Sequence, residues 1–330
     1  MVKYGRCEEK SCGEKKDMSS WVSALLTRKP PPRKPLPEVA FAPGAQRVVL
    51  PIQTRHQVCN PSIMARSEGG YLCIVRGANY NLDQGHAFFY GSRRTRLPDT
   101  QSYLMRLSPD LAVEAVCFVE DRHLRAEEPA LDGIEDYRLF RWQGATWVLG
   151  TARNATAQTN VMVLARLEGH VLEGARFLPS PLGAREEKNW TPVVVDGALH
   201  VIYSHHPLRV YRVEAAGLVL VSQTDAPDLE RCSGGSCALA LPGGGWRSVV
   251  HRYESVRDWR WRAYEHLVVD YGPDHSVARI SRPFRFEFDG VEFCAGLAQA
   301  PGGVVLSYGV KDNRALLVRL RDADFEALFG

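Results

Sequence analysis

The sequence predicts an all-β protein, a five-bladed β-propeller with an extended, basic, proline-rich N-terminal tail. From about residue 45, short runs rich in Val, Ile, Leu, Tyr and Trp alternate with Gly, Asp, Asn and Pro turns, and no long helical periodicity interrupts them before Asp322–Leu328. Short strands at this spacing are typical of a sandwich, a barrel or a propeller. A hairpin with a glycine turn also recurs five times, which favours the propeller and indicates five blades.

The first 44 residues are expected to form a tail or linker, and residues 45–330 the propeller. The tail carries an excess of Lys and Arg and a run from Ser19 to Leu26 that is compatible with a short helix. The stretch Lys29-Pro-Pro-Pro-Arg-Lys-Pro-Leu-Pro follows, and it favours a stiff polyproline conformation. We interpret it as a linker or a strap across the domain surface, with a PxxP ligand as the alternative.

The five hairpins share the order strand, glycine turn, aromatic strand. They lie at Glu68–Val75, Arg141–Leu149, Val195–Tyr203, Pro242–Val250 and Pro301–Tyr308. A polar cluster precedes each one: Asn60–Ser62, Glu135–Arg138, Lys188–Pro192, Ser233–Ser236 and Glu292–Gly296. Because the innermost strand of a blade lines the central channel, we expect these clusters to converge on one pocket at the axis. Solvated turns would explain one such cluster but not five in the same register.

The segment Glu135-Asp136-Tyr137-Arg138 is the sharpest candidate for chemistry. Side chains alternate along a strand, so Asp136 and Arg138 share one face, where Arg138 can orient Asp136 or balance its charge. We therefore predict that Asp136 is the catalytic acid. A turn of mixed charge is usually a surface feature, so this prediction depends on the position of the segment among the five polar clusters.

Other polar residues suit a sugar site at the axis. Lys188 is a candidate anion-binding charge and Trp190 a candidate sugar-stacking face, with a solvated loop and a buried Trp as the alternative. His251, Tyr264 and Asp312 would add a polar lining.

The sequence does not indicate a metal site. His205 and His206 are adjacent but lack further ligands at a suitable spacing, so we expect them to form hydrogen bonds. None of the eight cysteines forms a Cys-x-x-Cys pair. Those in apolar runs are expected to be small buried hydrophobic residues: Cys59, Cys73, Cys117 and Cys294.

The composition argues against several classes of protein. The net charge of +3 is too small to predict a nucleic-acid partner. No apolar run approaches the ~20 residues that a membrane span needs. The polar N-terminus lacks the apolar region of a signal peptide, so we expect a cytoplasmic protein. The sequence has no Gly-x-Ser-x-Gly, which argues against a hydrolase nucleophile elbow.

Taken in order, the motifs resemble those of glycoside hydrolase family 130, the mannoside phosphorylases and related mannosidases, which are five-bladed propellers. Asn60-Pro-Ser resembles the family's Asn-Pro entry, and Glu135-Asp136-Tyr137-Arg138 resembles its Glu-Asp-Pro-Arg with Tyr137 in place of Pro. Motifs of later blades resemble Glu187–Trp190, His251 with Tyr264, and Tyr308–Asp312. The resemblance covers roughly residues 45–320.

The resemblance implies roles for individual residues. Asp136 would be the proton donor in an inverting reaction at a mannoside-type sugar. Substrate contacts are implied for Asn60, Arg76, Arg138, Trp190, Tyr264, Glu292 and Asp312, and phosphate contacts for Lys188, His251 and Arg153, with Arg166 as a further positional candidate. If water is the nucleophile, Glu292 or Asp312 would be the base, at ~6.5–9.5 Å from the acid.

Three functions are compatible with these features. The first is an enzyme that cleaves or forms a mannoside-type glycosidic bond with inversion, by hydrolysis or with inorganic phosphate as co-substrate, and without another cofactor. The second is a glycosyltransferase on the same propeller that uses a sugar-phosphate or sugar-nucleotide donor. The third is a non-catalytic glycan-binding module, since a fold does not determine a function. An oligosaccharide or glycoconjugate is the expected partner in each case.

Overall fold

The computed structural model describes residues 35–52, 54, 56–83, 86–89, 100–125, 131–154, 159–255 and 262–330. Pro35–Gly330 forms one compact unit, which therefore begins upstream of the boundary at residue 45 expected from the sequence. The short 3₁₀ helix η1 (Val39–Phe41) explains the difference, because Val39 and Ala40 are buried in the core and donate backbone hydrogen bonds to Arg285 and Phe286. The predicted helix and polyproline stretch of the tail lie outside the described residues, apart from Pro35–Pro37.

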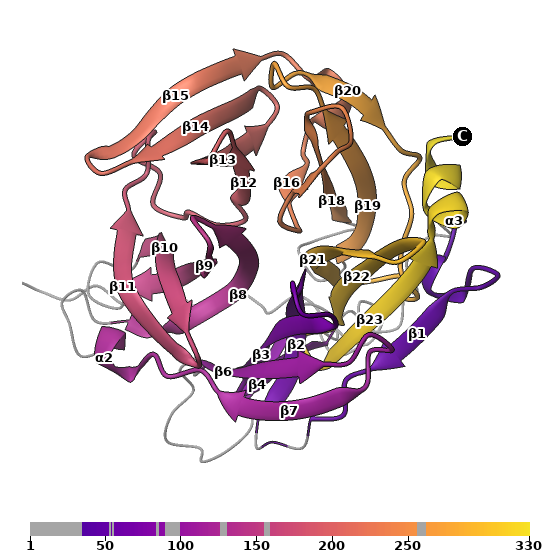
Figure 1. The fold of residues 1–330 in the computed structure, drawn as a ribbon, viewed down its shortest axis with the longest axis horizontal. Helices are drawn as coiled ribbons and strands as arrows, with labels where there is room; N and C mark the ends of the chain where they lie inside the picture. The colour runs from indigo at the N-terminus through magenta and orange to yellow at the C-terminus, as the bar shows by residue number, and fades with distance from the viewer. Residues whose placement is uncertain are drawn as a thin grey trace, which may run out of the picture. The chain divides into compact units, whose positions relative to one another are not determined.

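Five antiparallel sheets stand around a central axis and form a five-bladed β-propeller, as predicted (Figure 1). Blade 1 contains β2 (Gln57–Ala65), β3 (Tyr71–Ala78), β6 (Thr100–Leu107) and β7 (Val113–Phe118). Blade 2 contains β8 (Leu131–Trp142), β9 (Ala145–Asn154), β10 (Thr159–Glu168) and β11 (Val171–Leu178). Blade 3 contains β12 (Thr191–Val195), β13 (Ala198–His205), β14 (Leu208–Glu214) and β15 (Gly217–Thr224).

Blade 4 contains β16 (Ser233–Gly234), β17 (Leu239–Ala240), β18 (Trp246–Ser255), β19 (Arg262–Tyr271) and β20 (Val277–Ile280). Blade 5 contains β21 (Glu292–Ala300), β22 (Gly303–Val310), β23 (Arg314–Arg321) and β1 (Gln46–Val49). A small hairpin, β4 (Tyr80–Asp83) and β5 (His86–Phe89), lies between β3 and β6 in the chain. Short helices are η2 (Pro227–Leu229), α2 (Arg122–Arg125), α3 (Asp322–Glu326) and η3 (Ala327–Phe329), the last two at the predicted C-terminal helix. Within the described ranges, no helix has the length and apolar content to span a membrane.

The ring is closed by strand pairing between distant parts of the chain. β1 is the outermost strand of blade 5 and pairs antiparallel with β23, with Val48 opposite Leu317. The fifth blade is therefore completed by residues from both ends of the propeller. Because β1 adds a row of backbone hydrogen bonds that joins these ends, opening the ring requires breaking this ladder.

The predicted glycine turns connect the innermost strand of each blade to its neighbour. Two of them, Gln143-Gly144 and Asp196-Gly197, have positive φ at both positions, as the tight hairpin between β8 and β9 or β12 and β13 requires. Asn, Asp and Gly adopt this backbone region most readily, so the turn residues also determine the strand register.

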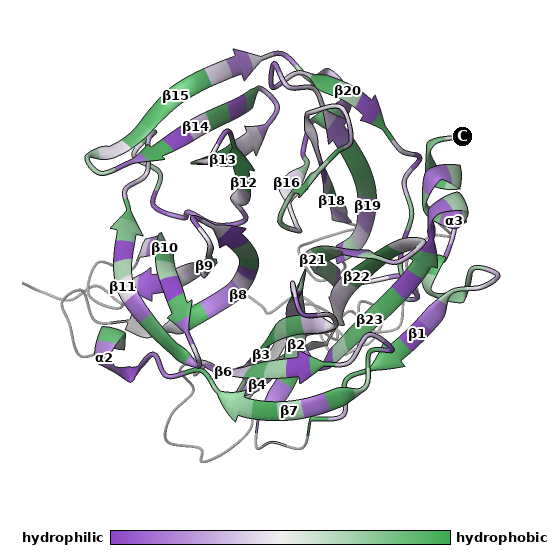
Figure 2. Cartoon of the chain, in the orientation of Figure 1, coloured by the Kyte–Doolittle hydropathy of each residue, from purple (hydrophilic) through white to green (hydrophobic). Residues whose placement is uncertain are grey.

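Hydrophobic clusters fill the spaces between adjacent blades. There are five clusters in the described core, and each combines buried side chains from two neighbouring sheets. Figure 2 shows apolar residues on the strands of every sheet. Both faces of a blade are therefore covered, and burial of this apolar surface is the main stabilising contribution.

The cysteines follow this pattern with one exception. Cys59, Cys73 and Cys294 are buried, as predicted. Cys117 is exposed, which corrects the expectation from its apolar surroundings in the sequence. The reason is its position on β7, the outermost strand of blade 1, where most side chains face solvent.

The axis has a polar end and an apolar end. The last residues of the inner strands line an apolar cavity of about 290 Å³, to which all five blades contribute, for example through Ile63, Leu139, Val193, Leu239 and Leu297. The polar clusters lie at the opposite ends of these strands. The predicted polar clusters therefore lie at the ends of the inner strands opposite this cavity.

A cavity mutation tests the packing between blades. Leu317 is fully buried between blades 5 and 1. We expect Leu317→Ala to lower the free energy of unfolding by about 2–5 kcal/mol, because it removes buried methyl groups and leaves a void. Urea unfolding measures this change. Val219→Ala, on the exposed part of β15, is the control and should change it by less than about 0.5 kcal/mol. Equal effects of the two substitutions would contradict this account of the core.

Candidate active site

The inner strands are irregular where the polar clusters lie. The register shifts between Cys59 and Ser62 on β2, and between Glu135 and Arg138 on β8. Asn60 and Asp136 lie in these shifts with φ of 45° and 49°. Asn and Asp tolerate this left-handed backbone better than most residues, and a bulge redirects the side chain it carries. Local sequence chemistry therefore places an amide and a carboxylate at equivalent positions in blades 1 and 2.

These two side chains meet directly. Asn60 Nδ2 donates to Asp136 Oδ1 at 2.9 Å and contacts Asp312 Oδ1 at 3.3 Å, from the turn between β22 and β23. Arg76 Nη1 lies 3.3 Å from Asp136 Oδ1. The Asp136 side chain is 21% exposed, so solvent and ligands can reach it. Four of the predicted residues, from blades 1, 2 and 5, therefore form one cluster.

Arg76 is the cation of this cluster. It is almost fully buried, and its Nη2 lies 2.5 Å from Glu135 Oε1 and donates to Tyr80 Oη at 2.5 Å. Burial alone would lower the pKa of Arg76, but Glu135, Tyr80 and Asp136 outweigh it and raise this pKa well above its usual value. Arg76 therefore remains charged at the centre of the carboxylates.

The surrounding carboxyl groups are shifted toward the protonated form. Burial raises the pKa of Glu135, the charges of Asp136 and Asp312 add to this, and Arg76 and Lys188 oppose it. Burial also raises the pKa of Asp312, with a further contribution from Asp136 and opposition from Arg76. Three carboxyl groups thus share one arginine, a set of environments that is typical of functional sites.

Arg138 is placed differently from the prediction. It is fully buried, and its guanidinium donates to the carbonyl of Asp136 at 2.5 Å, to Asn189 Oδ1 at 3.1 Å and to the carbonyl of Gly235 at 2.9 Å. The guanidinium also lies 5.3 Å from the centre of the Phe293 ring. The bulge at Glu135–Arg138 breaks the expected alternation, so Arg138 links four blades and contacts the backbone carbonyl of Asp136 instead of its carboxylate.

Trp190 and Glu292 also have structural surroundings. Trp190 is buried, donates from Nε1 to Glu187 at 2.9 Å and packs against Tyr203, which leaves no open face for a sugar. This matches the alternative of a buried Trp. Glu292 is fully buried and accepts backbone hydrogen bonds from residues 286, 287 and 288 at 2.7–2.8 Å. These hydrogen bonds hold this segment in place, and the role of Glu292 as a base toward substrate stays a prediction.

Blade 4 contributes an aromatic wall. His251 is buried and stacks on Tyr264, with ring centres 5.3 Å apart, and Tyr253 stacks on the same tyrosine at 5.6 Å. Burial lowers the pKa of His251 well below its usual value, so its imidazole is neutral. Burial raises the pKa of Tyr264 to about 12, and Asp312 contributes to this shift. The wall therefore lies within electrostatic reach of the carboxylate cluster.

Lys188 is exposed, and its charge acts on both Glu135 and His251. Arg153 lies on β9, opposite Asn160 on β10, and its contact with phosphate stays a prediction. Arg166 pairs with Glu168 and Glu173 on exposed surface of blade 2, and this pairing does not link it to the axial cluster.

Three contributors were not selected from the sequence as site residues: Glu135, Tyr80 and Gly309. Glu135 could have been selected from the sequence, because it is a charged residue directly before Asp136. Tyr80 packs over Arg76, with the guanidinium 5.6 Å from its ring centre. Gly309 is needed because a Cβ there would overlap the Asn60 side chain. Tyr80 is a near neighbour of Arg76 in the chain, whereas Gly309 and Asn60 are far apart in the sequence, so only the structure shows that second contact.

Among the described residues, no group of three or more His, Cys, Asp or Glu side chains is arranged to hold a metal ion.

No family model and no curated protein match the chain. Among solved structures, one similar protein is from the GH130 family of mannoside phosphorylases, which contains glycoside hydrolases that target β-1,2-mannosidic linkages in Candida mannan; it has 14% identity and a TM-score of 0.58 over 81% of this chain and 85% of that one. A β-1,2-mannobiose phosphorylase from Listeria innocua has 12% identity and a TM-score of 0.56 over 87% and 99% of the two chains. A GH43_1 enzyme from Xanthomonas citri has 14% identity and a TM-score of 0.51 over 82% and 90%. These similarities confirm the propeller fold and agree with the family resemblance of the motifs.

Buried histidines near the site make stability depend on pH. His266 lies opposite His251 on β19, packs against Phe284 and Phe286, and has no partner for either ring nitrogen among the described residues. Burial lowers the pKa of His266 to about 3, whereas an unfolded chain has about 6.5. Below about pH 6.5 the unfolded chain therefore binds a proton that the folded protein excludes. The free energy of unfolding consequently decreases as the pH is lowered.

We expect His266→Phe to remove this contribution. Between about pH 6.5 and 4, the free energy of unfolding of the parent should fall by about 1.4 kcal/mol per pH unit more than that of the variant. Urea unfolding at several pH values measures both slopes. Comparing the two chains cancels the opposite contribution of Glu292, whose pKa burial raises to about 7. Parallel profiles for the two chains would count against a buried neutral His266.

Proposed function

We propose that the protein is a carbohydrate-active enzyme whose axial site cleaves or forms a mannoside-type glycosidic bond with inversion, and that Asp136 is its acid. The observation that carries this proposal is the accessible Asp136 carboxylate, held by Asn60 and Arg76 at the polar end of the axis. The similar folds that act on β-1,2-mannosides support the substrate class.

The geometry suits proton donation by one oxygen of Asp136. Within the part of the chain that the structure describes, the side-chain contacts to this carboxylate use Oδ1. This leaves Oδ2 available to a glycosidic oxygen, or to a sugar hydroxyl that relays the proton. Fixing one oxygen orients the other, which is the main contribution a general acid needs from its neighbours.

The spacing of the carboxylates favours phosphate over water as the nucleophile. Because the Asn60 amide nitrogen contacts both Asp136 and Asp312, the two contacted oxygens lie within about 6 Å of each other, which leaves little room between them for the water that a carboxyl separation of ~6.5–9.5 Å accommodates in inverting hydrolases. Phosphate is an anion and needs no base to activate it. We propose that Lys188, His251 and Arg153 contact phosphate, and that Asn60, Arg76, Tyr264 and Asp312 contact the sugar.

The role of Asp136 is tested by Asp136→Asn. We expect kcat/KM with β-1,2-mannobiose and inorganic phosphate to fall by about 10²–10⁴-fold, since the amide cannot donate the proton in the same way. Release of mannose and mannose 1-phosphate measures turnover, and an unchanged unfolding curve shows that the fold is intact. Unchanged turnover would remove Asp136 as the acid. Absence of turnover by the parent on all glycans would favour the binding module.

The nucleophile is tested by following phosphate. We expect the parent to consume phosphate and form mannose 1-phosphate, and Lys188→Ala to raise the KM for phosphate about tenfold without a similar change for the sugar. Arg185→Ala is the matched control, because Arg185 is an exposed cation of the same connecting segment. Free mannose as sole product would indicate hydrolysis. Turnover that requires a sugar-nucleotide donor would indicate a transferase.

A further inference from the structure

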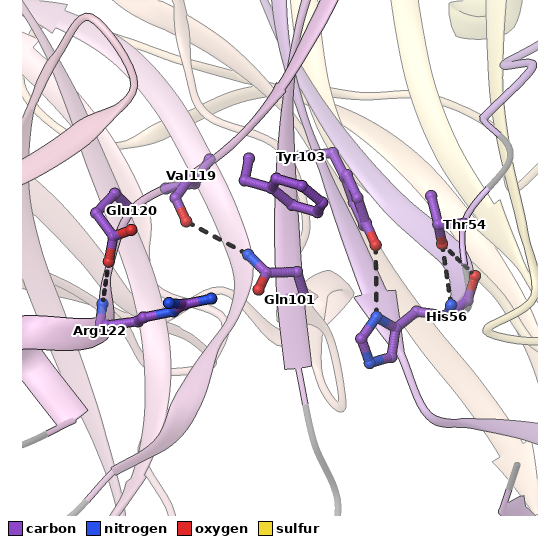
Figure 3. Close-up of a pocket in the computed structure, with 8 residues that line it drawn as sticks. Thr54, His56, Gln101, Tyr103, Val119, Glu120 and Arg122 are labelled. Carbon is purple, nitrogen blue, oxygen red and sulfur yellow. Dashed lines mark hydrogen bonds between the residues drawn. The ribbon is translucent and has the colours of Figure 1, made fainter. Parts of the chain in front are cut away.

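A second cavity lies on the outer part of blade 1. It measures about 300 Å³ and is lined by Thr54, His56, Gln101, Tyr103, Phe118, Val119, Glu120 and Arg122 (Figure 3). A neighbouring cavity of about 510 Å³ shares Thr54, Tyr103, Phe118 and Glu120 with it. We call this pair of cavities the blade 1 pocket. None of the axial residues described above lines it, and its combined size is that of a small-molecule site.

One side of the blade 1 pocket is built and rigid. His56 and Tyr103 are buried, and His56 Nδ1 lies 3.4 Å from Tyr103 Oη. Tyr103 belongs to β6 and faces Phe118 on β7, with their ring centres 5.3 Å apart. Phe118 is 61% exposed, although it is large and apolar. Phe118 therefore offers an exposed aromatic face to the pocket, and the buried ring of Tyr103 packs against it.

The other side carries polar groups with unused capacity. Gln101 Nε2 contacts the carbonyls of Ser102 and Val119, each at 3.4 Å, and in the described ranges no donor contacts its Oε1. Glu120 Oε1 accepts the backbone N–H of Arg122 at 3.0 Å, and Oε2 has no partner among the residues that the structure describes. Figure 3 shows that the side chains of Gln101 and Arg122 point into the same space. Among the described residues, the Arg122 guanidinium forms no ion pair.

This combination selects the chemical class of the ligand. A sugar ring has an apolar C–H face that can lie on Phe118, and hydroxyl groups that can bond to the amide of Gln101, the carboxylate of Glu120 and the guanidinium of Arg122. The opposite charges of Glu120 and Arg122 offset each other, so the pocket does not favour an anionic or a cationic ligand over a neutral one. A purely apolar partner would bury these polar groups unpaired, which costs free energy.

We propose that the blade 1 pocket is a second, non-catalytic binding site for a neutral saccharide. It lies on blade 1, and the axial acid lies on blade 2. The site therefore can hold a distal unit of a glycan, or a separate glycan, without taking part in bond cleavage. The inference uses only the chemistry of the pocket and does not depend on the activity proposed for Asp136.

Cys117 provides a local probe of occupancy. It lines the larger cavity and is exposed, whereas Cys232 on the other side of the ring is half-buried. Iodoacetamide alkylation of both residues, followed by peptide mass spectrometry, is measured with and without β-1,2-mannotetraose, cellotetraose and xylotetraose. We expect at least one tetrasaccharide to slow alkylation of Cys117 by about threefold or more at saturation, and to leave Cys232 unchanged.

Matched variants separate this pocket from the axial site. Phe118→Ala should abolish the protection of Cys117, whereas Phe41→Ala, which removes an equally exposed Phe elsewhere, and Asp136→Asn should retain it. Phe118→Ala should also leave kcat/KM on β-1,2-mannobiose unchanged. The proposal is overturned if no saccharide protects Cys117, if protection survives in Phe118→Ala, or if it is lost in Asp136→Asn. Protection that rises with protein concentration in the absence of saccharide would instead show a protein interface on this face.

Discussion

The buried guanidinium of Arg138 is the interaction on which the centre of the propeller depends. It reaches the inner strands of blades 2, 3 and 4 through hydrogen bonds, and the aromatic ring of Phe293 in blade 5. A buried charge is costly unless each donor finds an acceptor, and here neutral oxygens of separate strands provide them. Burial lowers the pKa of Arg138 and the nearby Asp136 opposes this. These hydrogen bonds fix the inner strands, with their bulges, around the Arg138 side chain. Asp136 lies in one of these bulges, so its position is fixed as well.

Close backbone packing adds a second constraint on the same region. A Cβ at Gly234 would overlap the carbonyl of Asn189, and a Cβ at Gly296 would overlap Ser307 and Ile63. These glycines allow the inner strands of neighbouring blades to approach each other closely. Arg138 is fully buried where these strands meet, and a mainly apolar cavity lies at the ends of the inner strands opposite the polar clusters.

The electrostatics of the pocket follow from one cation among three carboxyl groups. Arg76 pairs with Glu135 and Asp136, while Asn60 joins Asp136 to Asp312. Such an arrangement holds the acids close together in spite of their mutual repulsion. Burial raises the pKa of Glu135 and Asp312, the charge of Asp136 adds to this, and Arg76 opposes it. The folds that this chain resembles at 12–14% identity share the architecture, but the chemistry must be judged from these side chains.

The sequence by itself determined the all-β class, the five glycine turns and the polar entries that hold Asn60 and Asp136, because turn chemistry and repeated polar entries are local signals. Arg76 and Asp312 lie outside these entries, and their contacts with Asn60 and Asp136 come from the tertiary structure. Only the tertiary structure decided the direction of side chains at bulges and blade contacts. Arg138, Trp190 and Glu292 are polar or aromatic residues in the predicted clusters, yet they are buried as structural anchors. The bulge at Glu135–Arg138 reverses the alternation that a regular strand predicts, and contacts such as Gly309 with Asn60 join residues from opposite ends of the chain. Neither effect has a local signature, since each arises from packing between blades.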